Sequence, residues 1–222
     1  MEFQSICKFR DNNMSTNFTV GNDTFASNPG NANLNPFVWL FHDFKTIFTI
    51  SALFGFSIFL TIKFSGWFGI LAVLFMAINI FYWLRKKEHF KSGDSNGGMV
   101  VSINPTLVAV TTDLTKGFGE FPVVKIITCN TLKNVKVGDK IATVALYSAS
   151  EDDDLPHWID FHPIPLSFAT NNEKVLKRAF ESYDSEQWKN LQNRLEKIRK
   201  PYKEGLYTSE TQTSDWKSTN IF

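Results

Sequence analysis

The sequence predicts an α+β protein: an N-terminal transmembrane helical hairpin, then a small β-barrel-like or bent antiparallel sheet with two C-terminal helices. Three observations lead to this fold class. A long stretch near the N-terminus is almost purely apolar, although the mean hydropathy of the whole chain is −0.14. After it, apolar residues alternate in short runs rich in Val and Ile, which is typical of strands. Towards the C-terminus they recur at helical spacing.

The composition of the 222-residue chain excludes several classes of protein. Lys and Arg number 23 and Asp and Glu number 22, which leaves a formal net charge of +1. Such a balance provides no basic field for nucleic acid, so we expect no nucleic-acid partner. Two cysteines, Cys7 and Cys129, are too few for a disulfide framework or a four-thiolate metal site. We expect no cofactor and no metal.

Residues 1–36 are expected to form a disordered N-terminal tail. Asparagine is frequent in this segment, and Pro29-Gly30 interrupts any regular structure. No periodic apolar pattern runs through it, so it offers little surface to bury.

Residues 37–88 are predicted to form a membrane hairpin. Two uncharged runs, 17 residues over 46–62 and 18 residues over 67–84, are joined by a short turn that forces them antiparallel. A spanning helix needs about 20 residues, with a usable range of about 17–25. A buried hairpin in a soluble core is the alternative, which two uncharged runs of this length disfavour. The lipid bilayer is therefore the expected partner of residues 46–84.

The basic residues predict how the hairpin is oriented. Lys45 precedes the first run, whereas Arg85 to Lys87 and Lys91 follow the second, and the turn contains only Lys63. Basic residues stay on the cytoplasmic side of a membrane. We therefore expect a two-span protein of the inner (cytoplasmic) membrane with both termini in the cytoplasm.

A cytoplasmic β-rich domain is expected over residues 94–205, after a polar linker over 85–96. Five strands are predicted where Val- and Ile-rich runs lie between turn residues, the fifth being interrupted by prolines. They are Met99–Ile103, Thr106–Thr112, Phe121–Thr128, Ile141–Tyr147 and Trp158–Thr170.

Two helices are expected to complete this domain by capping an open end of the barrel. Apolar residues from Val175 to Tyr183 recur at helical spacing. Asp184, with Gln187 three residues later, has the pattern of a capping box for a second helix that ends before Pro201. Residues 206–222 are rich in Ser and Thr and are expected to form a mobile tail.

Five side chains are candidates for contacts with a ligand or a partner: Asp113, Lys116, His157, Asp160 and His162. The first two lie in a glycine-containing loop that could contact an anion, although a structural hairpin loop is favoured. The other three belong to a segment rich in carboxylates and histidines. Strand alternation would place Asp160 and His162 on the same face as Trp158, whereas His157 would lie on the other face. Two local ligands are too few for a metal site. We predict that Trp158 is structural and that Asp160 and His162 carry function.

Three ordered motifs resemble a known family: Asn104–Lys116 (NPTLVAVTTDLTK), Ala142–Tyr147 (ATVALY) and Pro156–Phe161 (PHWIDF). They resemble a bacterial family of uncharacterised proteins that is known only as a domain of unknown function. The resemblance extends over residues 97–195. It implies a bacterial source and a single β-rich unit, and it supplies no activity and no catalytic residue.

The leading functional hypothesis is a non-enzymatic, membrane-anchored cytoplasmic binding or scaffold module, which leaves room for a protein partner on the cytoplasmic side. One alternative is a membrane-associated enzyme that uses Asp113, Lys116, His157 and Asp160, and it requires these side chains to converge in one cleft. Another is a small oligomeric channel-like protein, which needs a regular small-residue face on the second apolar helix. No Gly-x-Ser-x-Gly nucleophile elbow is present, so the sequence leans away from an enzyme without deciding the question.

Overall fold

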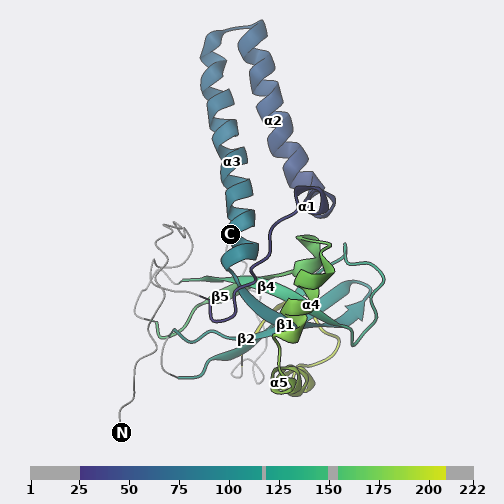
Figure 1. Ribbon diagram of the computed structural model, residues 1–222. Helices are drawn as coiled ribbons and strands as arrows, with labels where there is room; N and C mark the ends of the chain where they lie inside the picture. Colours follow the sequence, from purple (N-terminus) through teal and green to yellow (C-terminus); the bar gives the residue numbers. More distant parts are fainter. Residues whose placement is uncertain (1–25, 117–118, 150–154, 209–222) are drawn as a thin grey trace.

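A computed structural model describes residues 26–116, 119–149 and 155–208 and shows a helical hairpin that stands on a curled β-sheet (Figure 1). The helices are α1 (Pro36–His42), α2 (Phe44–Lys63), η1 (Gly66–Phe68), α3 (Gly69–Ser92), η2 (Leu166–Phe168), α4 (Glu173–Glu181) and α5 (Ser185–Glu196), where η marks a 3-10 helix. The strands are β1 (Asp94–Ile103), β2 (Thr106–Asp113), β3 (Pro122–Thr128), β4 (Lys140–Ser148), β5 (Asp160–Pro165) and β6 (Gly205–Thr208).

Helices α2 and α3 form the hairpin that the two apolar runs predict. The side chain of Ser65 caps the turn by accepting a hydrogen bond from the backbone N–H of Trp67. Both helices are long and apolar enough to cross a membrane, and only 11% and 0% of their apolar windows are buried. The apolar side chains of the hairpin therefore face its surroundings instead of forming a protein core.

Helix α3 runs on into the domain, so the prediction of a polar linker over residues 85–96 is wrong. Neither glycine nor proline occurs between Leu84 and Ser92 to end the helix. Its last turns bury His89 and Phe90, whose side chains are 6% and 0% exposed. Only Gly93 separates the helix from β1. A Cβ atom at this position would collide with the carbonyl oxygen of His89, which explains the glycine.

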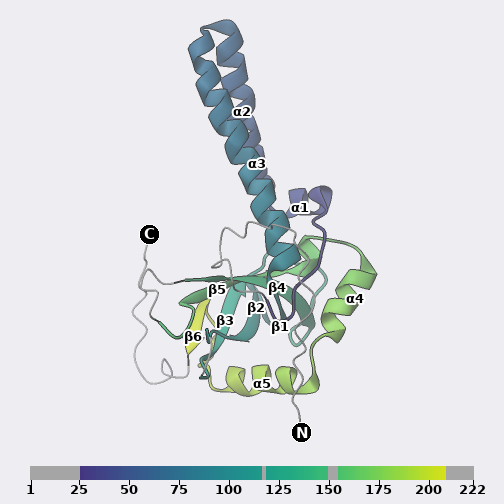
Figure 2. The same ribbon diagram turned by 60° about the vertical axis from the view of Figure 1, so that its left-hand side comes forward.

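The six strands form one antiparallel sheet in the order β5-β4-β1-β2-β3-β6, curled into a half-barrel (Figure 2). The bent antiparallel sheet of the sequence-based fold class is thereby confirmed. Alternation along the strands divides the apolar side chains between two clusters. Val100 and Val144 belong to the inner cluster together with Phe90 of α3. Met99 and Ala109 belong to the outer cluster.

The two C-terminal helices form as expected, but they cover different surfaces. Ala179 of α4 belongs to the inner cluster, so this helix helps to close the half-barrel. Trp188, Leu191 and Leu195 of α5 pack instead on the outer cluster. Figure 2 shows α5 lying across that face of the sheet. The expectation that both helices cap an open end is therefore correct for α4 and wrong for α5.

Residues 26–35 are ordered, which corrects the expectation of disorder for the end of the N-terminal tail; residues 1–25 lie outside the described residues. We call residues 26–35 the N-terminal strap. Its backbone bonds to the junction of α3 and β1: the N–H of Gly30 donates to the carbonyl oxygen of Gly93 at 2.9 Å. Ala32 and Leu34 are buried in the inner cluster. Main-chain hydrogen bonds hold the strap, and they leave no periodic pattern in the sequence.

The strand boundaries differ from the predictions by more than one residue at three places. β1 begins at Asp94 instead of Met99, because residues 94–98 pair with β4. The predicted fifth strand is shorter, since β5 ends at Pro165 and η2 follows it. At the C-terminus, Gly205–Thr208 forms β6 on the edge of β3, which corrects the expected tail there; residues 209–222 lie outside the described residues.

Candidate functional site

Strands β1 and β2 pair along only part of their lengths. Their register runs from Ile103 opposite Thr106 to Gly98 opposite Val110. Beyond that point β1 continues on β4, while β2 continues on β3. The strands therefore separate at one end and open a cleft of about 790 Å³. This volume falls within the range of about 300–1,000 Å³ that small-molecule sites occupy.

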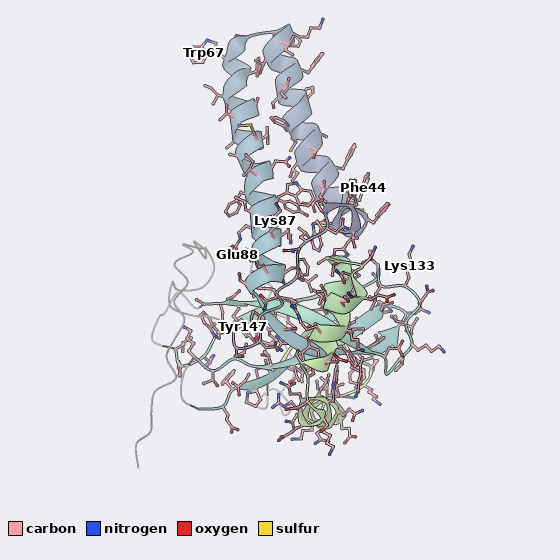
Figure 3. The ribbon with its side chains drawn as sticks, in the orientation of Figure 1. Phe44, Trp67, Lys87, Glu88, Lys133 and Tyr147 are labelled. Carbon is pink, nitrogen blue, oxygen red and sulfur yellow. The ribbon has the colours of Figure 1, made fainter. Side chains whose placement is uncertain are left out.

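Five segments line this cleft, which we call the strand cleft. They are the first residues of β1, the last residues of β2, the last residues of β4, the N-terminal strap and the polar side of α5, with the end of α3 at one margin. Figure 3 labels two of the lining residues, Glu88 of α3 and Tyr147 of β4, near the foot of the hairpin. The site thus lies where the hairpin joins the sheet.

A short chain of hydrogen bonds crosses the cleft. The hydroxyl of Tyr147 donates to Oδ2 of Asp94 on β1 at 2.9 Å. The same hydroxyl lies 2.7 Å from Oγ1 of Thr112 on β2. Oδ1 of Asp94 accepts from the backbone N–H of Asn28 in the strap at 3.2 Å. One tyrosine and one carboxyl group therefore connect both strands and the strap.

Burial raises the pKa values of both titratable members of this chain. Burial raises the pKa of the Asp94 carboxyl above its ordinary value, although the hydrogen bonds from Tyr147 and Asn28 act in the opposite direction. Burial also raises the pKa of the Tyr147 phenol, and the nearby charge of Asp94 adds to this effect. Tyr147 therefore remains a hydrogen-bond donor at physiological pH.

The other end of the cleft carries opposite charges. Nη1 of Arg194 on α5 donates to Oγ1 of Thr111 at 2.6 Å. Burial lowers the pKa of the Arg194 guanidinium, and the charge of Asp113 opposes that shift. Burial acts to raise the pKa of the Asp113 carboxyl, but hydrogen bonds from Thr115 and Phe121 outweigh burial and hold it below its ordinary value. A cation and an anion thus face the same opening.

Aromatic side chains form the apolar part of the lining. The ring of Trp188 lies against Gly97, where an added Cβ atom would come within 3.0 Å of the ring. The hydroxyl of Tyr183 lies 2.8 Å from Oγ of Ser95. A side chain at position 97 would therefore displace the tryptophan, which accounts for a glycine within a strand.

Of the five predicted candidates, Asp113 lines the strand cleft, whereas Lys116 and His157 lie on the neighbouring loops. The Nζ atom of Lys116 lies 4.9 Å from the ring centroid of Trp158. The imidazole of His157 stacks on Phe121 with a centroid distance of 3.8 Å. Backbone hydrogen bonds join the two loops. These bonds, together with the ring contacts to Trp158 and Phe121, explain the positions of both side chains.

Asp160 and His162 lie on β5, away from the cleft lining. Lys125 of β3 donates from Nζ to Oδ2 of Asp160 at 2.7 Å and also to the carbonyl oxygen of Phe161 at 2.7 Å. β3 and β5 are not neighbours in the sheet order, so this ion pair ties the curled sheet across its open side. Nε2 of His162 lies 2.8 Å from Oγ of Ser148, and burial lowers the pKa of its imidazole.

The prediction that Trp158, Asp160 and His162 share one face is wrong. Trp158 precedes β5, which begins at Asp160, so strand alternation does not extend to it. Its side chain is 9% exposed and packs in the inner cluster with Phe161. His162 points to the exposed side. The structural role predicted for Trp158 agrees with this burial.

Sequence reasoning missed Asp94, Tyr147 and Arg194. Asp94 opens a run of small and polar residues that has the composition of a linker, Tyr147 lies near the end of a strand, and Arg194 lies on the polar side of a helix. They come together only because the half-barrel curls, and no sequence spacing links them. Among the described residues, no group of three or more His, Cys, Asp or Glu side chains is placed to hold a metal ion.

A family model described as "Protein of unknown function (DUF3239)" matches residues 84–199, which is more than half of the chain. The chain belongs to this family. The membership confirms the resemblance to a domain of unknown function. The DUF3239 match begins within α3 and therefore includes Phe90, which packs in the inner cluster.

Among solved structures, the chain is similar to the crystal structure of "a putative membrane protein from Corynebacterium diphtheriae". The two share 24% sequence identity, and the match covers 52% of this chain and 99% of that chain, with a TM-score of 0.44. No curated protein matches the chain.

Proposed function

We propose that this DUF3239 protein is a membrane-anchored binding module whose β domain holds a small polar molecule in the strand cleft. The observation that carries the proposal is the position of the cleft: it opens at the foot of two exposed apolar helices, between strands that separate within one sheet. The hairpin supplies the anchor, and the separated strands supply the site.

The anchor is proposed to cross the membrane twice, with the β domain and both termini on the cytoplasmic side. Lys45 and Arg85 to Lys87 lie at the domain end of the hairpin, whereas Lys63 is the basic residue near its tip. Basic residues are retained on the cytoplasmic side. Exposed apolar side chains along both helices support contact with lipid.

The lining of the cleft favours a polar ligand that carries hydroxyl or amide groups. Hydroxyl groups come from β1, β2 and β4, and amide groups come from the strap, β1 and α5; they belong to Asn28, Asn31, Ser95, Asn96, Thr111, Thr112, Tyr147, Gln187 and Asn190. Each can donate or accept a hydrogen bond. The charges of Asp113 and Arg194 oppose one another, so the lining has no strong preference for an ion of either sign.

Binding is favoured over catalysis because the enzyme hypothesis required four side chains in one cleft, and only one of those four lines it. Within the part of the chain that the structure describes, Asp113 lines the strand cleft, whereas Lys116, His157 and Asp160 do not. Lys116 lies over Trp158, and Asp160 is paired with Lys125. The nucleophile, base and stabilising groups of an active site are therefore not assembled from these candidates.

Cysteine labelling tests the anchor and its orientation. In a Cys7→Ser background, a membrane-impermeant maleimide should label Ser65→Cys at the hairpin tip in intact cells. It should label Lys133→Cys in the β domain only after lysis. Labelling of Lys133→Cys in intact cells would reverse the orientation, and release of the protein by an alkaline carbonate wash would overturn the anchor.

Native mass spectrometry of the detergent-extracted full chain tests the cleft. Molecules that bear several hydroxyl or amide groups should be retained at one per chain and should raise the melting temperature. Tyr147→Phe and Gly97→Val should weaken retention, whereas the matched surface change Lys133→Gln should not. Equal retention by all three variants would overturn the assignment of the cleft, as would the absence of any retained molecule across the tested set.

A further inference from the structure

Helix α1 presents two phenylalanine side chains to the surroundings at the foot of the hairpin. Phe37 and Phe41 are 75% and 85% exposed. Their spacing of four residues places them on one face of the helix. Figures 1 and 2 show α1 set across the base of α2, at an angle to the hairpin axis. An apolar face of this kind is unusual for a helix that contacts only water.

The exposure of this face does not result from a loosely attached helix. Trp39 on the opposite side is 1% exposed, and its Nε1 donates to the hydroxyl of Tyr82 on α3 at 2.6 Å. That hydroxyl donates in turn to Oδ2 of Asp43 at 2.7 Å. The imidazole of His42 stacks on Phe168 with a centroid distance of 3.9 Å. Helix α1 is therefore fixed to both α3 and η2.

The apolar face of α1 continues into the apolar surface of the hairpin. Phe44 and Phe48 on the first turns of α2 are 56% and 60% exposed, and their rings stack with a centroid distance of 5.6 Å. Figure 3 shows Phe44 at the base of the hairpin, close to the level of Lys87 on α3. Lys45 and Lys87 are both exposed. Aromatic rings beside basic side chains are typical of the boundary between lipid and water.

We propose that α1 lies in the headgroup layer of the bilayer, with Phe37 and Phe41 in the lipid, and thereby holds the β domain against the membrane in one orientation. The inference rests on the proposed membrane span of α2 and α3. The occupant of the exposed face is the same bilayer that surrounds the hairpin. Interfacial helices place such apolar faces about 5–10 Å into the boundary between headgroups and acyl chains.

The contacts of α1 explain how it would orient the domain. Nδ1 of His42 lies 2.9 Å from Oγ1 of Thr131 in the loop after β3, and the same ring stacks on Phe168 of η2. One side of α1 thus contacts the β domain, whereas the other side faces outward. With α3 as a second attachment, the domain is held at two points and cannot rotate about the axis of α3.

Depth-dependent fluorescence quenching tests this inference on the full chain. Cysteines introduced one at a time into a Cys7→Ser background, in which the remaining Cys129 is buried, carry an NBD label. The protein is reconstituted into vesicles of phosphatidylcholine and phosphatidylglycerol. Phe41→Cys reports on α1 and Phe56→Cys on α2, while Lys189→Cys on α5 is the control exposed to water and carries the same dye. Lipids with a nitroxide near the headgroup or deep in the acyl chain act as quenchers.

The expected result is that position 41 is quenched several-fold more strongly by the shallow nitroxide, position 56 by the deep nitroxide, and position 189 by neither. If position 41 behaves like position 189 while position 56 is quenched, the inference fails and the membrane anchor stands. If position 41 is quenched as deeply as position 56, α1 is inserted instead of interfacial and the inference also fails. If neither position 41 nor position 56 is quenched, both the inference and the proposed membrane anchor fail.

Discussion

The phenol of Tyr147 joins the carboxyl group of Asp94 to the hydroxyl of Thr112 across the strand cleft. The phenol donates its single hydrogen to Asp94 at 2.9 Å, so the hydroxyl of Thr112, 2.7 Å away, must be the donor to the phenol oxygen. Asp94 and Thr112 belong to the two strands that separate here. One side chain from a third strand therefore spans the gap where direct pairing between β1 and β2 has ended.

Replacing this phenol tests its role in the cleft. Tyr147→Phe keeps the aromatic ring, which stacks near Phe161 at a centroid distance of 6.2 Å, and removes both hydrogen bonds. We expect a loss of about 1–2 kcal/mol in the free energy of unfolding, because about 1 kcal/mol is typical for each such bond. Urea unfolding in detergent measures the change. Tyr207→Phe, which removes a hydroxyl on the edge strand, is the matched control with a smaller expected effect; equal effects would contradict the assigned role.

The pKa of Asp94 predicts how stability depends on pH. Burial raises the folded-state pKa of this carboxyl above its ordinary value of 3.8. Its contribution to stability is therefore fully present below the unfolded pKa and is lost as the pH rises through the folded pKa. We expect Asp94→Asn to gain stability relative to the wild type as the pH rises above the ordinary pKa of 3.8, as measured by the difference in melting temperature at each pH.

Asp113 provides a control of opposite sign within the same cleft. Despite partial burial, hydrogen bonds hold its folded-state pKa below the ordinary value. The stability it contributes is present above the unfolded pKa and is lost as the pH falls through the folded pKa. Asp113→Asn should therefore lower the melting temperature at neutral pH and have less effect in acid. If the difference in melting temperature from the wild type changes in the same direction with pH for both variants, the burial argument for Asp94 is incorrect.

The burial of Phe90 predicts that the β domain needs the end of α3. Phe90 is 0% exposed and its ring lies 5.5 Å from that of Trp39, edge to face. Phe90→Ala should cost about 3–5 kcal/mol, the range for a large aromatic side chain lost from a core. A fragment that begins at residue 94 lacks the Phe90 ring, so we expect it to aggregate without detergent. Cooperative melting of that fragment would show that the end of α3 is dispensable.

The residues before and within β5 should differ in their effects on stability. Trp158→Ala removes a ring that is 9% exposed in the inner cluster and should cost about 3–5 kcal/mol. Asp160→Asn weakens the bond to Lys125 and should cost about 1–2 kcal/mol, moderated because the carboxyl side chain is 32% exposed. His162→Gln should leave the melting temperature nearly unchanged.

A double-mutant cycle with Lys125→Gln measures the coupling between β3 and β5. A coupling energy near zero between positions 125 and 160 would show that the pair does not close the half-barrel. A loss at Asp160→Asn as large as that at Trp158→Ala would instead make Asp160 part of the core.

The regular part of the fold could be predicted because its signals are local. The uncharged runs define α2 and most of α3, and the Val-rich runs place β2 to β4 close to their observed bounds. Asp184 and Gln187 form the predicted capping box at the start of α5. Each of these elements depends on side chains that are neighbours in sequence or on one face of the element.

The site could not be predicted in the same way because distant segments build it. Asp94 and Gly97 belong to β1 through pairing with β4, although their local sequence favours a linker. Asn28 meets Asp94 through its backbone, which no side-chain pattern encodes. Phe90 looks like a continuation of the apolar helix and only the fold shows that it is buried in the inner cluster. These contacts depend on how the sheet curls, which one sequence does not reveal.

Helix α3 runs from the tip of the hairpin to the inner cluster without a proline or glycine after Gly69, and about 24 residues give it a length of roughly 36 Å. Such a helix moves as one rigid element. A span that is longer than the local bilayer thickness tilts. Because one residue, Gly93, separates α3 from β1, any tilt of the helix turns the strand that forms one wall of the cleft. With α3 crossing the bilayer as proposed, a change in bilayer thickness would be transmitted as torque on the half-barrel.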